Sequence, residues 1–300
     1  MIVEVAAAVI QRPDGSFLLA QRPPGKVYAG YWEFPGGKAE SGEPAAVALA
    51  RELHEELGIE VERAYPWLTR VFTYPHATVR LNFFRVVAWR NDPHPREDQA
   101  IAWQYPGTMP SPMLPANAPV LAALDLPVEY AVTDTARYGS AGMLDRLERQ
   151  LEGGLKLVQL REPGLSAEER RIFCQNAIGR ARRYGCKVMV KEPVPGADGI
   201  HFTAAQLHLL EKRPAEGLAA ASCHTREDLE RAMALEQDFA VLGPVQEKAG
   251  RPVLGWDGFA RIAAGTSIPL YAIGGLTRAD LEEAWRAGAH GIAMIRGAWS

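Results

Sequence analysis

The sequence predicts an α/β protein with two domains, of which the second is a (β/α)8 barrel. Three observations favour this fold. A chain of 300 residues has the length of about two ordinary domains. Residues 1–127 place strands and turns around one long helix, whereas residues 128–300 alternate short apolar strands with helices. Prolines are frequent between residues 91 and 115, and Leu126-Pro127 is typical of a hinge.

Hydrophobic patterns in the first domain predict four strands and two helices. The strands are expected over residues 3–10, 17–21, 70–74 and 78–89. The turn Pro13-Asp14-Gly15 joins the first two. Residues 91–115 are expected to form a loop, and a short helix follows over 116–124.

The longer helix is expected over residues 45–57, which are rich in Ala, Leu and Glu, all good helix formers. Pro44 suits the first helical position, because its missing N–H costs nothing there. Gly58 is expected to end the helix as a C-cap glycine. At about 100° per residue, one face collects the apolar side chains that we expect to be buried: Val47, Ala50, Leu53 and Leu57.

The opposite face of this helix is acidic and carries Glu52, Glu55 and Glu56. Like charges at positions i and i+4 weaken a bare helix by about 0.2–0.5 kcal/mol, and a divalent cation would reverse the sign of that effect. Mg²⁺ prefers oxygen ligands and is usually held jointly by carboxylates and substrate phosphates. The face is therefore a candidate Mg²⁺ site. The alternative is an acidic surface that only contacts solvent.

The whole stretch from residue 37 to residue 59 follows the pattern G-x5-E-x7-R-E-U-x-E-E-x-G-U, where U is aliphatic. The matching residues are Gly37, Glu43, Arg51, Glu52, Leu53, Glu55, Glu56, Gly58 and Ile59. The stretch resembles the Nudix box, without departures. The resemblance implies a Nudix domain over residues 1–127 with the fold of an α/β/α sandwich around a mixed sheet. It also implies Mg²⁺-dependent hydrolysis of a phosphoric anhydride, in a nucleoside diphosphate linked to another moiety.

Segments around the box narrow the substrate. Residues 20–22, 31–38, 74–75 and 114–120 resemble the MutT-type 8-oxo-dGTP diphosphatases, and the resemblance covers residues 1–125. It implies hydrolysis of 8-oxo-dGTP to 8-oxo-dGMP and pyrophosphate, an activity that keeps oxidised nucleotides out of DNA replication and repair. The alternatives are another nucleotide or a pyrophosphate of the thiamine pathway.

Four residues are candidates for substrate binding. The amide of Asn117 donates and accepts hydrogen bonds at once, which suits the edge of a purine; the alternative is a helix N-cap. Arg22 suits a phosphate or base contact, or else is an exposed arginine at a strand end. Phe34 is a candidate wall of the base pocket, or else part of the core, and Glu33 precedes it in the segment that leads into the box.

The resemblance also implies the metal ligands: the carbonyl of Gly36, and Glu52, Glu55, Glu56 and Glu97. Mn²⁺ is expected to substitute for Mg²⁺. Arg51 is expected to pair with Glu43 and to fix the loop against the helix. Glu52 or Glu97 is the candidate general base. The alternatives are that Glu97 is only an exposed loop acid and that Asp98 takes its role.

The second domain has eight β-like segments in a βα rhythm, which favours a closed barrel over an open doubly wound sheet, the alternative. The expected strands are 130–133, 156–160, 187–190, 199–202, 218–222, 239–242, 269–273 and 291–295. Helices are expected over 141–152, 167–184, 227–235 and 278–287.

Short motifs of this domain resemble the thiamine-phosphate synthase/TenI family over residues 129–298. They are 159–162, 196–201, 222–225, 242–245 and 272–275, in the family's order. The chain departs from the synthases at Pro163, which replaces a lysine, at Lys191-Glu192, which replaces an Asn-Asp pair, and at Gln206, which replaces a metal-binding aspartate. The family's phosphate loop falls on 246–250. We therefore expect residues 128–300 to lack synthase activity, with a bifunctional enzyme as the alternative.

Gly274 and Gly275 follow the seventh strand of the predicted barrel, where barrels often hold a phosphate. They form a candidate phosphate site, or else a glycine-rich turn in a structural barrel. His201 and His224 are candidates for acid–base chemistry, although histidines at strand ends are more often structural.

The composition limits partners and location. A net charge of −3 gives no electrostatic case for binding duplex nucleic acid or an anionic membrane, whereas a small nucleotide remains compatible because a metal supplies positive charge. The N-terminus lacks a signal-peptide pattern, and no apolar run is long enough to span a membrane. The three cysteines are expected to be buried thiols. These features predict a soluble cytoplasmic protein and do not indicate its oligomeric state.

Overall fold

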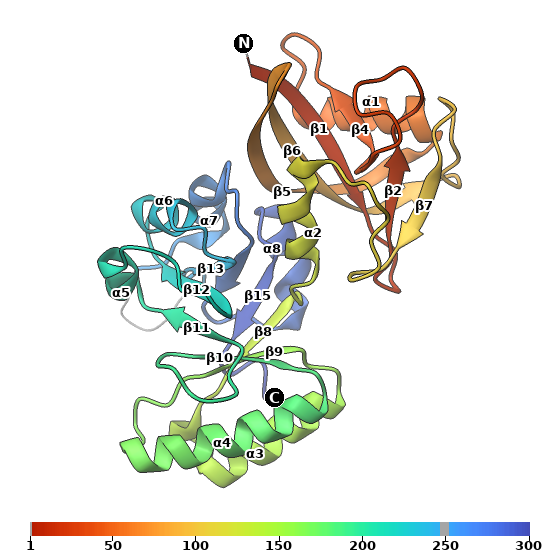
Figure 1. Ribbon diagram of the computed structural model, residues 1–300. Helices are drawn as coiled ribbons and strands as arrows, with labels where there is room; N and C mark the ends of the chain where they lie inside the picture. Colours follow the sequence, from red (N-terminus) through yellow and green to blue (C-terminus); the bar gives the residue numbers. More distant parts are fainter. Residues whose placement is uncertain (1, 247–251) are drawn as a thin grey trace. The chain divides into compact units, whose positions relative to one another are not determined.

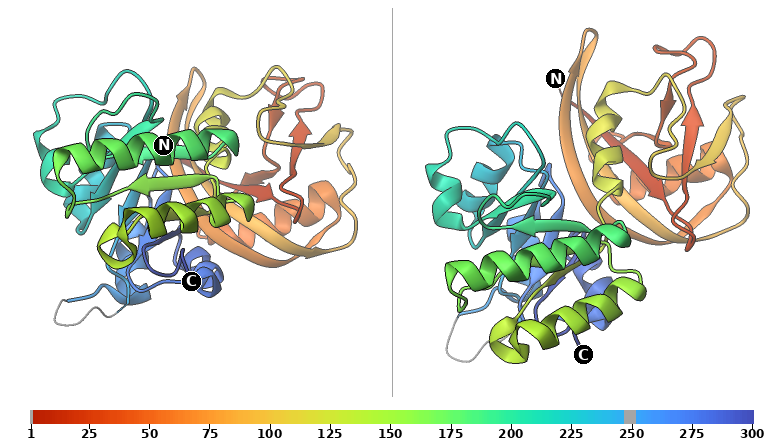
Figure 2. Two further views of the ribbon diagram at one scale, coloured as in Figure 1. Left: turned by 90° about the horizontal axis from the view of Figure 1, so that it is seen from below. Right: turned by 60° about the horizontal axis from the view of Figure 1, so that its bottom comes forward.

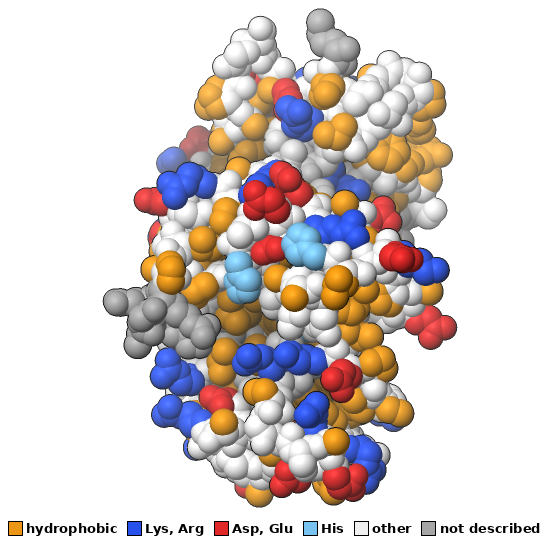
Figure 3. All heavy atoms as spheres, turned by 90° about the vertical axis from the view of Figure 1, so that its left-hand side faces the viewer, with side chains coloured by type: hydrophobic (Ala, Val, Ile, Leu, Met, Phe, Trp, Pro, Cys, Tyr) orange, Lys and Arg blue, Asp and Glu red, His pale blue; other side chains and the backbone are white. Residues whose placement is uncertain are grey.

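The computed structural model describes residues 2–246 and 252–300 (Figure 1). The chain forms two compact units, and the main boundary between them falls between Asp125 and Leu126. Within the described residues, no helix is long and apolar enough to cross a membrane. Figure 3 shows basic and acidic side chains interspersed on one face of the molecule.

The first unit contains a mixed four-stranded sheet and a smaller three-stranded sheet. The four-stranded sheet has the order β4 (Gly36–Lys38), β1 (Ile2–Ile10), β6 (Ala77–Arg90), β5 (Glu60–Tyr74). The three-stranded sheet has the order β3 (Trp32–Glu33), β2 (Phe17–Gln21), β7 (Ile101–Gln104). Only β1 and β6 run parallel to each other, so the four-stranded sheet is mixed, as expected.

Helices lie on both faces of the four-stranded sheet because β1 is apolar on both sides (Figure 2). Ala6, Ala8 and Ile10 pack in one cluster with the buried side chains of α1 (Ala45–Leu57). Ala7 and Val9 pack in another cluster with α2 (Ala118–Leu124), which follows the short 3₁₀ helix η1 (Pro115–Asn117). The alternation along the strand therefore builds the expected α/β/α sandwich.

Several details of the first unit differ from the prediction, among them strand β7, which lies in the segment 91–115 that was expected to form a loop. Pro44 is extended and precedes helix α1 as its N-cap, so it does not occupy the first helical position, although the helix itself has the expected bounds. Val47 and Ala50 were wrongly placed on the buried face; both are exposed, and the buried residues are Ala48, Leu49, Leu53 and Leu57. Strand β5 begins ten residues before the expected position, at Glu60, since it pairs along its whole length with β6.

The second unit is a closed parallel barrel, and the open-sheet alternative is wrong. The strand order around the barrel is β10-β11-β12-β13-β14-β15-β8-β9. The strands are β8 (Glu129–Val132), β9 (Leu157–Leu160), β10 (Lys187–Val190), β11 (Gly199–Phe202), β12 (Leu218–Cys223), β13 (Phe239–Leu242), β14 (Leu270–Ile273) and β15 (Gly291–Met294).

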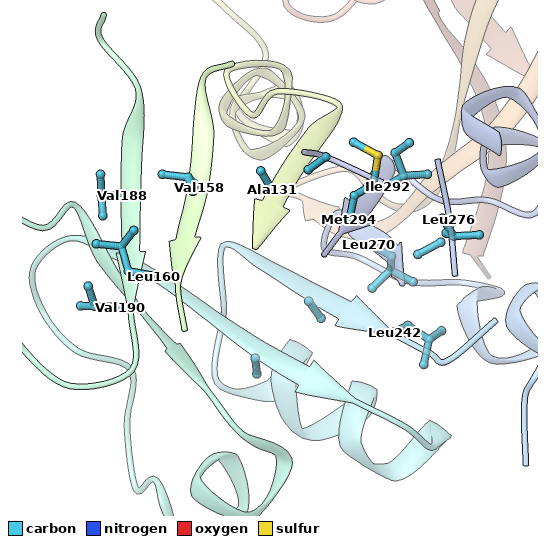
Figure 4. Close-up of a cluster of buried hydrophobic side chains, with 14 of the residues drawn as sticks. Ala131, Val158, Leu160, Val188, Val190, Leu242, Leu270, Leu276, Ile292 and Met294 are labelled. Atoms are coloured by element: carbon cyan, nitrogen blue, oxygen red, sulfur yellow. The ribbon is translucent and has the colours of Figure 1, made fainter. Parts of the chain in front are cut away.

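Helices surround this barrel and share an apolar cluster with the outer sides of its strands. They are α3 (Thr135–Glu152), α4 (Ala167–Arg183), α5 (Ala204–Leu209), α6 (Arg226–Ala234), α7 (Gly255–Ala263), η2 (Arg278–Asp280) and α8 (Leu281–Arg286). Figure 4 shows Val188, Val158, Ala131, Ile292 and Leu270 of this cluster, each on a different strand. Each strand therefore contributes an apolar side chain to the seam between sheet and helices.

Candidate active site

Helix α1 directs two glutamates at the backbone of strand β4. The amide of Gly36 donates a hydrogen bond of 3.2 Å to Oε2 of Glu56. A Cβ atom at position 37 would overlap the carboxyl group of Glu52, so the glycine at that position makes room for the carboxylate. Gly36 itself has a φ of 140°, and a Cβ there would overlap the carbonyl oxygen of Ala6. The Gly36-Gly37 pair thus allows both glutamates to approach one short strand.

Arg51 holds the loop before α1 against the helix. Its Nε and Nη2 donate to the two carboxylate oxygens of Glu43, at 3.1 and 2.9 Å, and Nη2 also donates to the carbonyl of Lys38 at 3.0 Å. Nη1 donates to Glu52 at 2.9 Å and to Glu55 at 3.3 Å. The expected pairing of Arg51 with Glu43 is present, and the same side chain fixes Glu52.

Glu56 lies in a pocket whose environment favours its neutral form. Burial raises the pKa of Glu56 to about 7, helped by repulsion from Glu33, Glu97 and Glu52 and opposed by the hydrogen bond from Gly36. The pocket is lined by Ala20, Gln21, Arg22, Pro23, Lys26, Glu33, Pro35, Glu56, Glu97 and Gln99. The pocket therefore gathers three of the predicted acids and one predicted cation, Arg22, at one place.

Arg22 and Glu33 form a bidentate ion pair inside this pocket. Nη1 of Arg22 donates to both carboxylate oxygens of Glu33, at 2.7 and 2.8 Å, and its Nε donates to the carbonyl of Val27 at 2.7 Å. Burial raises the pKa of Glu33, and the guanidinium of Arg22 opposes that rise. The pair fixes both side chains at the end of strand β2.

Two residues of the pocket were not predicted from the sequence. Lys26 donates to Glu97 at 2.9 Å. Gln99 is buried; it accepts from the amide of Glu97 at 2.7 Å and donates to the carbonyl of Glu56 at 3.0 Å. Gln99 therefore ties the loop that carries Glu97 to the end of helix α1. No local pattern indicates the contact of Lys26 with Glu97 or that of Gln99 with Glu56, since these partners are 71 and 43 positions apart in the sequence.

The two candidates for base recognition, Phe34 and Asn117, are buried in the domain and are not among the residues that line the pocket. Phe34 is buried, and its ring packs 6.0 Å from that of Phe17 and 5.9 Å from that of Phe83. Asn117 is also buried, and its Nδ2 lies 3.9 Å from the sulfur of Met113. Asn117 occupies the N-cap of α2 without a side-chain capping bond, so the N-cap alternative does not account for its amide.

The oxygen ligands around Gly36 suit a hard divalent cation. Glu52 and Glu56 are carboxylates one helical turn apart, and both face strand β4. Within residues 2–246 and 252–300, no three acidic, histidine or cysteine side chains are gathered closely enough to form a cluster that could hold a metal. The reason is visible in the contacts: Glu52 is turned to Arg51, Glu56 to Gly36 and Glu97 to Lys26. The donor chemistry of these residues fits such a cation, which would take the place of these present partners.

At the carboxyl ends of the barrel strands, the two candidate histidines are hydrogen-bonded. His201 is buried, with Nδ1 3.0 Å from the hydroxyl of Tyr130 and Nε2 2.9 Å from that of Ser222. Burial lowers the pKa of His201 to about 3, with help from Lys191 and Arg161, so the ring is neutral. His224 is exposed, and its Nδ1 lies 2.7 Å from the carbonyl of Gly243.

The glycines after β14 pack against a neighbouring loop. Gly274 has a φ of 118°, and a Cβ there would lie 2.8 Å from the backbone nitrogen of Val245. The carbonyl of Gly274 accepts from the amide of Gln246 at 3.2 Å. Gly275 has a φ of 71°. This contact explains the glycine at position 274. The rest of the expected phosphate loop, from 247 to 250, lies outside the described residues.

Comparison with known proteins assigns both units. Residues 6–123 match the NUDIX domain family, and residues 129–298 match the thiamine monophosphate synthase family. The chain belongs to both families. Its NUDIX domain is 39% identical to the CTP pyrophosphohydrolase of Escherichia coli, over 41% of this chain and 90% of that protein. The same domain is 36% identical to the 8-oxo-dGTP diphosphatase of Haemophilus influenzae, over 40% of this chain and 89% of that protein.

The barrel is 34% identical to the thiamine-phosphate synthase of Thermus thermophilus, over 55% of this chain and 85% of that protein. The NUDIX membership makes the first domain a hydrolase that acts on phosphoric anhydrides. The pocket that Glu56 lines is therefore the candidate active site of that hydrolase.

A second pocket lies in the synthase-like domain, at the opposite ends of the strands from His201. It is lined by Pro127, Val128, Glu129, Gln150, Gly153, Gly154, Leu155, Lys156 and Arg278. Its charged groups are paired: Arg278 with Glu129 at 2.9 Å, and Lys156 with the carbonyl of Tyr184 at 2.7 Å. Barrel enzymes react at the carboxyl ends of their strands, so this pocket is not the place to expect their chemistry.

Proposed function

We propose that the NUDIX domain is a Mg²⁺-dependent nucleoside triphosphate pyrophosphohydrolase whose preferred substrate is 8-oxo-dGTP, with 8-oxo-dGMP and pyrophosphate as products. The observation that supports it most is the approach of Glu52 and Glu56 to the Gly36-Gly37 backbone beside a pocket with two cationic side chains. Carboxylates for a cation and cations for phosphates are what phosphoric anhydride hydrolysis requires.

In this proposal the cation ligands are the carbonyl of Gly36 and the carboxylates of Glu52, Glu55, Glu56 and Glu97. When bound, Mg²⁺ supplies positive charge that offsets the charge on the phosphoryl oxygens and favours ionisation of the attacking water; Mn²⁺ has similar oxygen preferences. Glu55 is the most exposed of the three helix carboxylates, and it shares Nη1 of Arg51 with Glu52, at 3.3 and 2.9 Å.

Protein side chains supply the remaining steps. Glu52 or Glu97 accepts the proton of the attacking water. Arg51 and Glu43 fix the loop before α1 to the helix, and so hold the helix carboxylates in position. Arg22, held by Glu33, is directed into the pocket for a substrate phosphate or base. A water attack on a phosphorus atom then releases a nucleoside monophosphate and pyrophosphate.

For base recognition we propose Asn117, with Phe34 shaping the pocket behind it. The buried amide of Asn117 is not used for helix capping, and a purine edge would satisfy its donor and its acceptor together. Asn117→Ala should lower kcat/KM about tenfold on 8-oxo-dGTP and less on dGTP, because the lost hydrogen bonds discriminate between the bases. Steady-state kinetics on both substrates measure this, and an equal loss on the two would argue against base reading.

The decisive experiment measures pyrophosphate release from 8-oxo-dGTP, dGTP, CTP, ADP-ribose and thiamine diphosphate. CTP is the second candidate substrate, because the CTP pyrophosphohydrolase of Escherichia coli is 39% identical to this domain. Glu56→Gln should lose about a hundredfold or more in turnover while the fold is kept, since it removes a carboxylate from the site. Near-normal turnover of this variant would exclude the proposed site, and a strong preference for another compound would exclude 8-oxo-dGTP.

For the second domain we propose a barrel without synthase activity that retains a small phosphate site beside Gly274 and Gly275. The departures at Pro163, Lys191-Glu192 and Gln206 support the loss of the reaction. Backbone amides after the seventh barrel strand support the phosphate site, since barrels commonly bind phosphate there.

A further inference from the structure

Lys26 is one of the two cations of the hydrolase pocket, yet the NUDIX pattern contains no residue at its position and the proposed mechanism assigns it no role of its own. The pocket places its ammonium with Arg22, Glu33, Glu56 and Glu97. The ammonium donates to Oε2 of Glu97 at 2.9 Å, so it lies beside the proposed metal site.

The loop that carries Lys26 has a defined shape. The carbonyl of Arg22 accepts from the amide of Gly30 at 2.9 Å, which closes the loop at its base. The amide of Ala29 donates to the carbonyl of Lys26 at 3.1 Å. Tyr28 anchors the loop, because its ring lies 5.5 Å from that of Tyr74 at the end of β5. Backbone hydrogen bonds therefore fix the main chain at Lys26, whereas its exposed side chain can exchange one ion-pair partner for another.

The two cations of the pocket differ in how firmly they are held. Arg22 has a bidentate bond to Glu33 and a further bond to a backbone carbonyl, and its side chain is 24% exposed. Lys26 has a single bond to Glu97, and these two side chains are 48% and 43% exposed. An exposed ion pair contributes only about 0–1 kcal/mol, so other ions can replace either partner.

Glu97 is also a proposed ligand of the divalent cation, and its carboxylate cannot serve Lys26 and the cation equally well. We propose that Lys26 is a phosphate-binding residue of the hydrolase, paired with Glu97 in the metal-free protein and transferred to a substrate phosphate when Glu97 binds the cation. This inference rests on the proposed function of the pocket. The ammonium is a compact charge on a flexible stem, which suits such an exchange better than a guanidinium does.

Two affinities of opposite sign test the proposal, and neither depends on turnover. The first is the affinity for Mn²⁺ alone, measured by titration calorimetry on the full chain. Lys26→Met should bind Mn²⁺ about two- to fivefold more tightly than the wild type, because the competing ammonium is gone. The second is the affinity for the α,β-imido analogue of dGTP with saturating Mg²⁺. Lys26→Met should bind this analogue about tenfold more weakly, and Lys26→Arg should keep most of the affinity.

Arg80→Met is the matched control. Arg80 pairs with Glu4 at 2.8 Å, and these side chains are 45% and 41% exposed, so the variant loses an equivalent surface ion pair away from the pocket. It should change neither affinity. Unchanged or weaker Mn²⁺ binding by Lys26→Met would overturn the competition for Glu97, and unchanged analogue binding would overturn the phosphate contact. A wild type that hydrolyses no nucleoside triphosphate would contradict the proposed function instead, and the Mn²⁺ titration would still decide whether Lys26 competes for Glu97.

Discussion

At the scale of single residues, the burial of Glu56 in the pocket makes the free energy of unfolding depend on pH. Its pKa is about 7 in the folded protein, well above the ordinary value for glutamate in an unfolded chain. Below an ordinary glutamate pKa the carboxyl is neutral in both states. Between about 4.5 and about 7 the unfolded chain has lost the proton while the folded protein keeps it, so stability falls over this range. Above about 7 both states are ionised and the loss is complete, because the carboxylate is left in a buried site.

Glu56→Gln should therefore become more stable than the wild type as the pH rises from 4.5 to about 7, by up to about 3 kcal/mol, and the difference should then level off. Calorimetric unfolding of both proteins in a metal chelator measures it. Adding excess Mg²⁺ should reverse the order at pH 8, because the cation stabilises the wild-type carboxylate. If the difference in unfolding free energy between the two proteins does not vary with pH, the Glu56 carboxyl group is exposed to solvent and not buried in the pocket.

The residues of the box were predictable because they follow one another in a single loop and helix. The resemblance to the Nudix box predicted the ion pair of Glu43 and Arg51, which the structure shows. Contacts between distant segments were not predictable. The pairing of Lys26 with Glu97 joins residues 71 positions apart, and no periodicity relates two loops.

At the scale of elements, helix α1 is rotated about its axis relative to the prediction. A different set of side chains in its first turns therefore packs against the sheet. The periodicity of about 100° per residue placed Val47 on the buried face, yet its side chain is exposed. Ala48 and Leu49 are buried instead, because they face the alanines of β1 in the same cluster. The predicted face and the buried face share Leu53 and Leu57 and differ only in the first two turns, so the sequence alone leaves the phase of these turns open.

Leu53→Ala should destabilise the first domain by about 2–5 kcal/mol, because Leu53 is fully buried and the change leaves a cavity. Val47→Ala removes an exposed side chain and should stay within about 0.5 kcal/mol of the wild type. Hydrogen exchange of the amides in α1 measures the free energy of opening for both variants. Similar losses in the two would mean that the predicted phase of the helix was correct and the observed one is not.

At the scale of the whole molecule, the second domain was easier to predict than the first. Strands of a parallel barrel are buried on both sides, so they read as short apolar runs, and three of them, β10, β11 and β13, have the expected bounds. Helices α5 and α7 were not predicted, although α8 and α6, which are just as short at 6 and 9 residues, were. In the first domain β7 lies in a segment rich in proline and was missed for that reason.

The structure also shows what has become of the positions where the barrel departs from the synthases. Gln206 replaces an aspartate, and its Oε1 accepts from the amide of Thr203 at 2.9 Å as part of the cap of α5. Glu192 is 77% exposed and lies 3.8 Å from Arg170. Both side chains thus have local partners, and the amide of Gln206 supplies no negative charge to balance a metal bound to pyrophosphate.

The full chain should therefore form no thiamine phosphate above the uncatalysed rate. The assay is best made with Glu56→Gln, because an active hydrolase would consume a diphosphate substrate and mimic a missing synthase. The thiamine-phosphate synthase of Thermus thermophilus, 34% identical to the barrel, is the positive control under the same conditions. Formation of thiamine phosphate at a comparable rate would show that Gln206 and Glu192 are compatible with the reaction, and the chain would then be bifunctional.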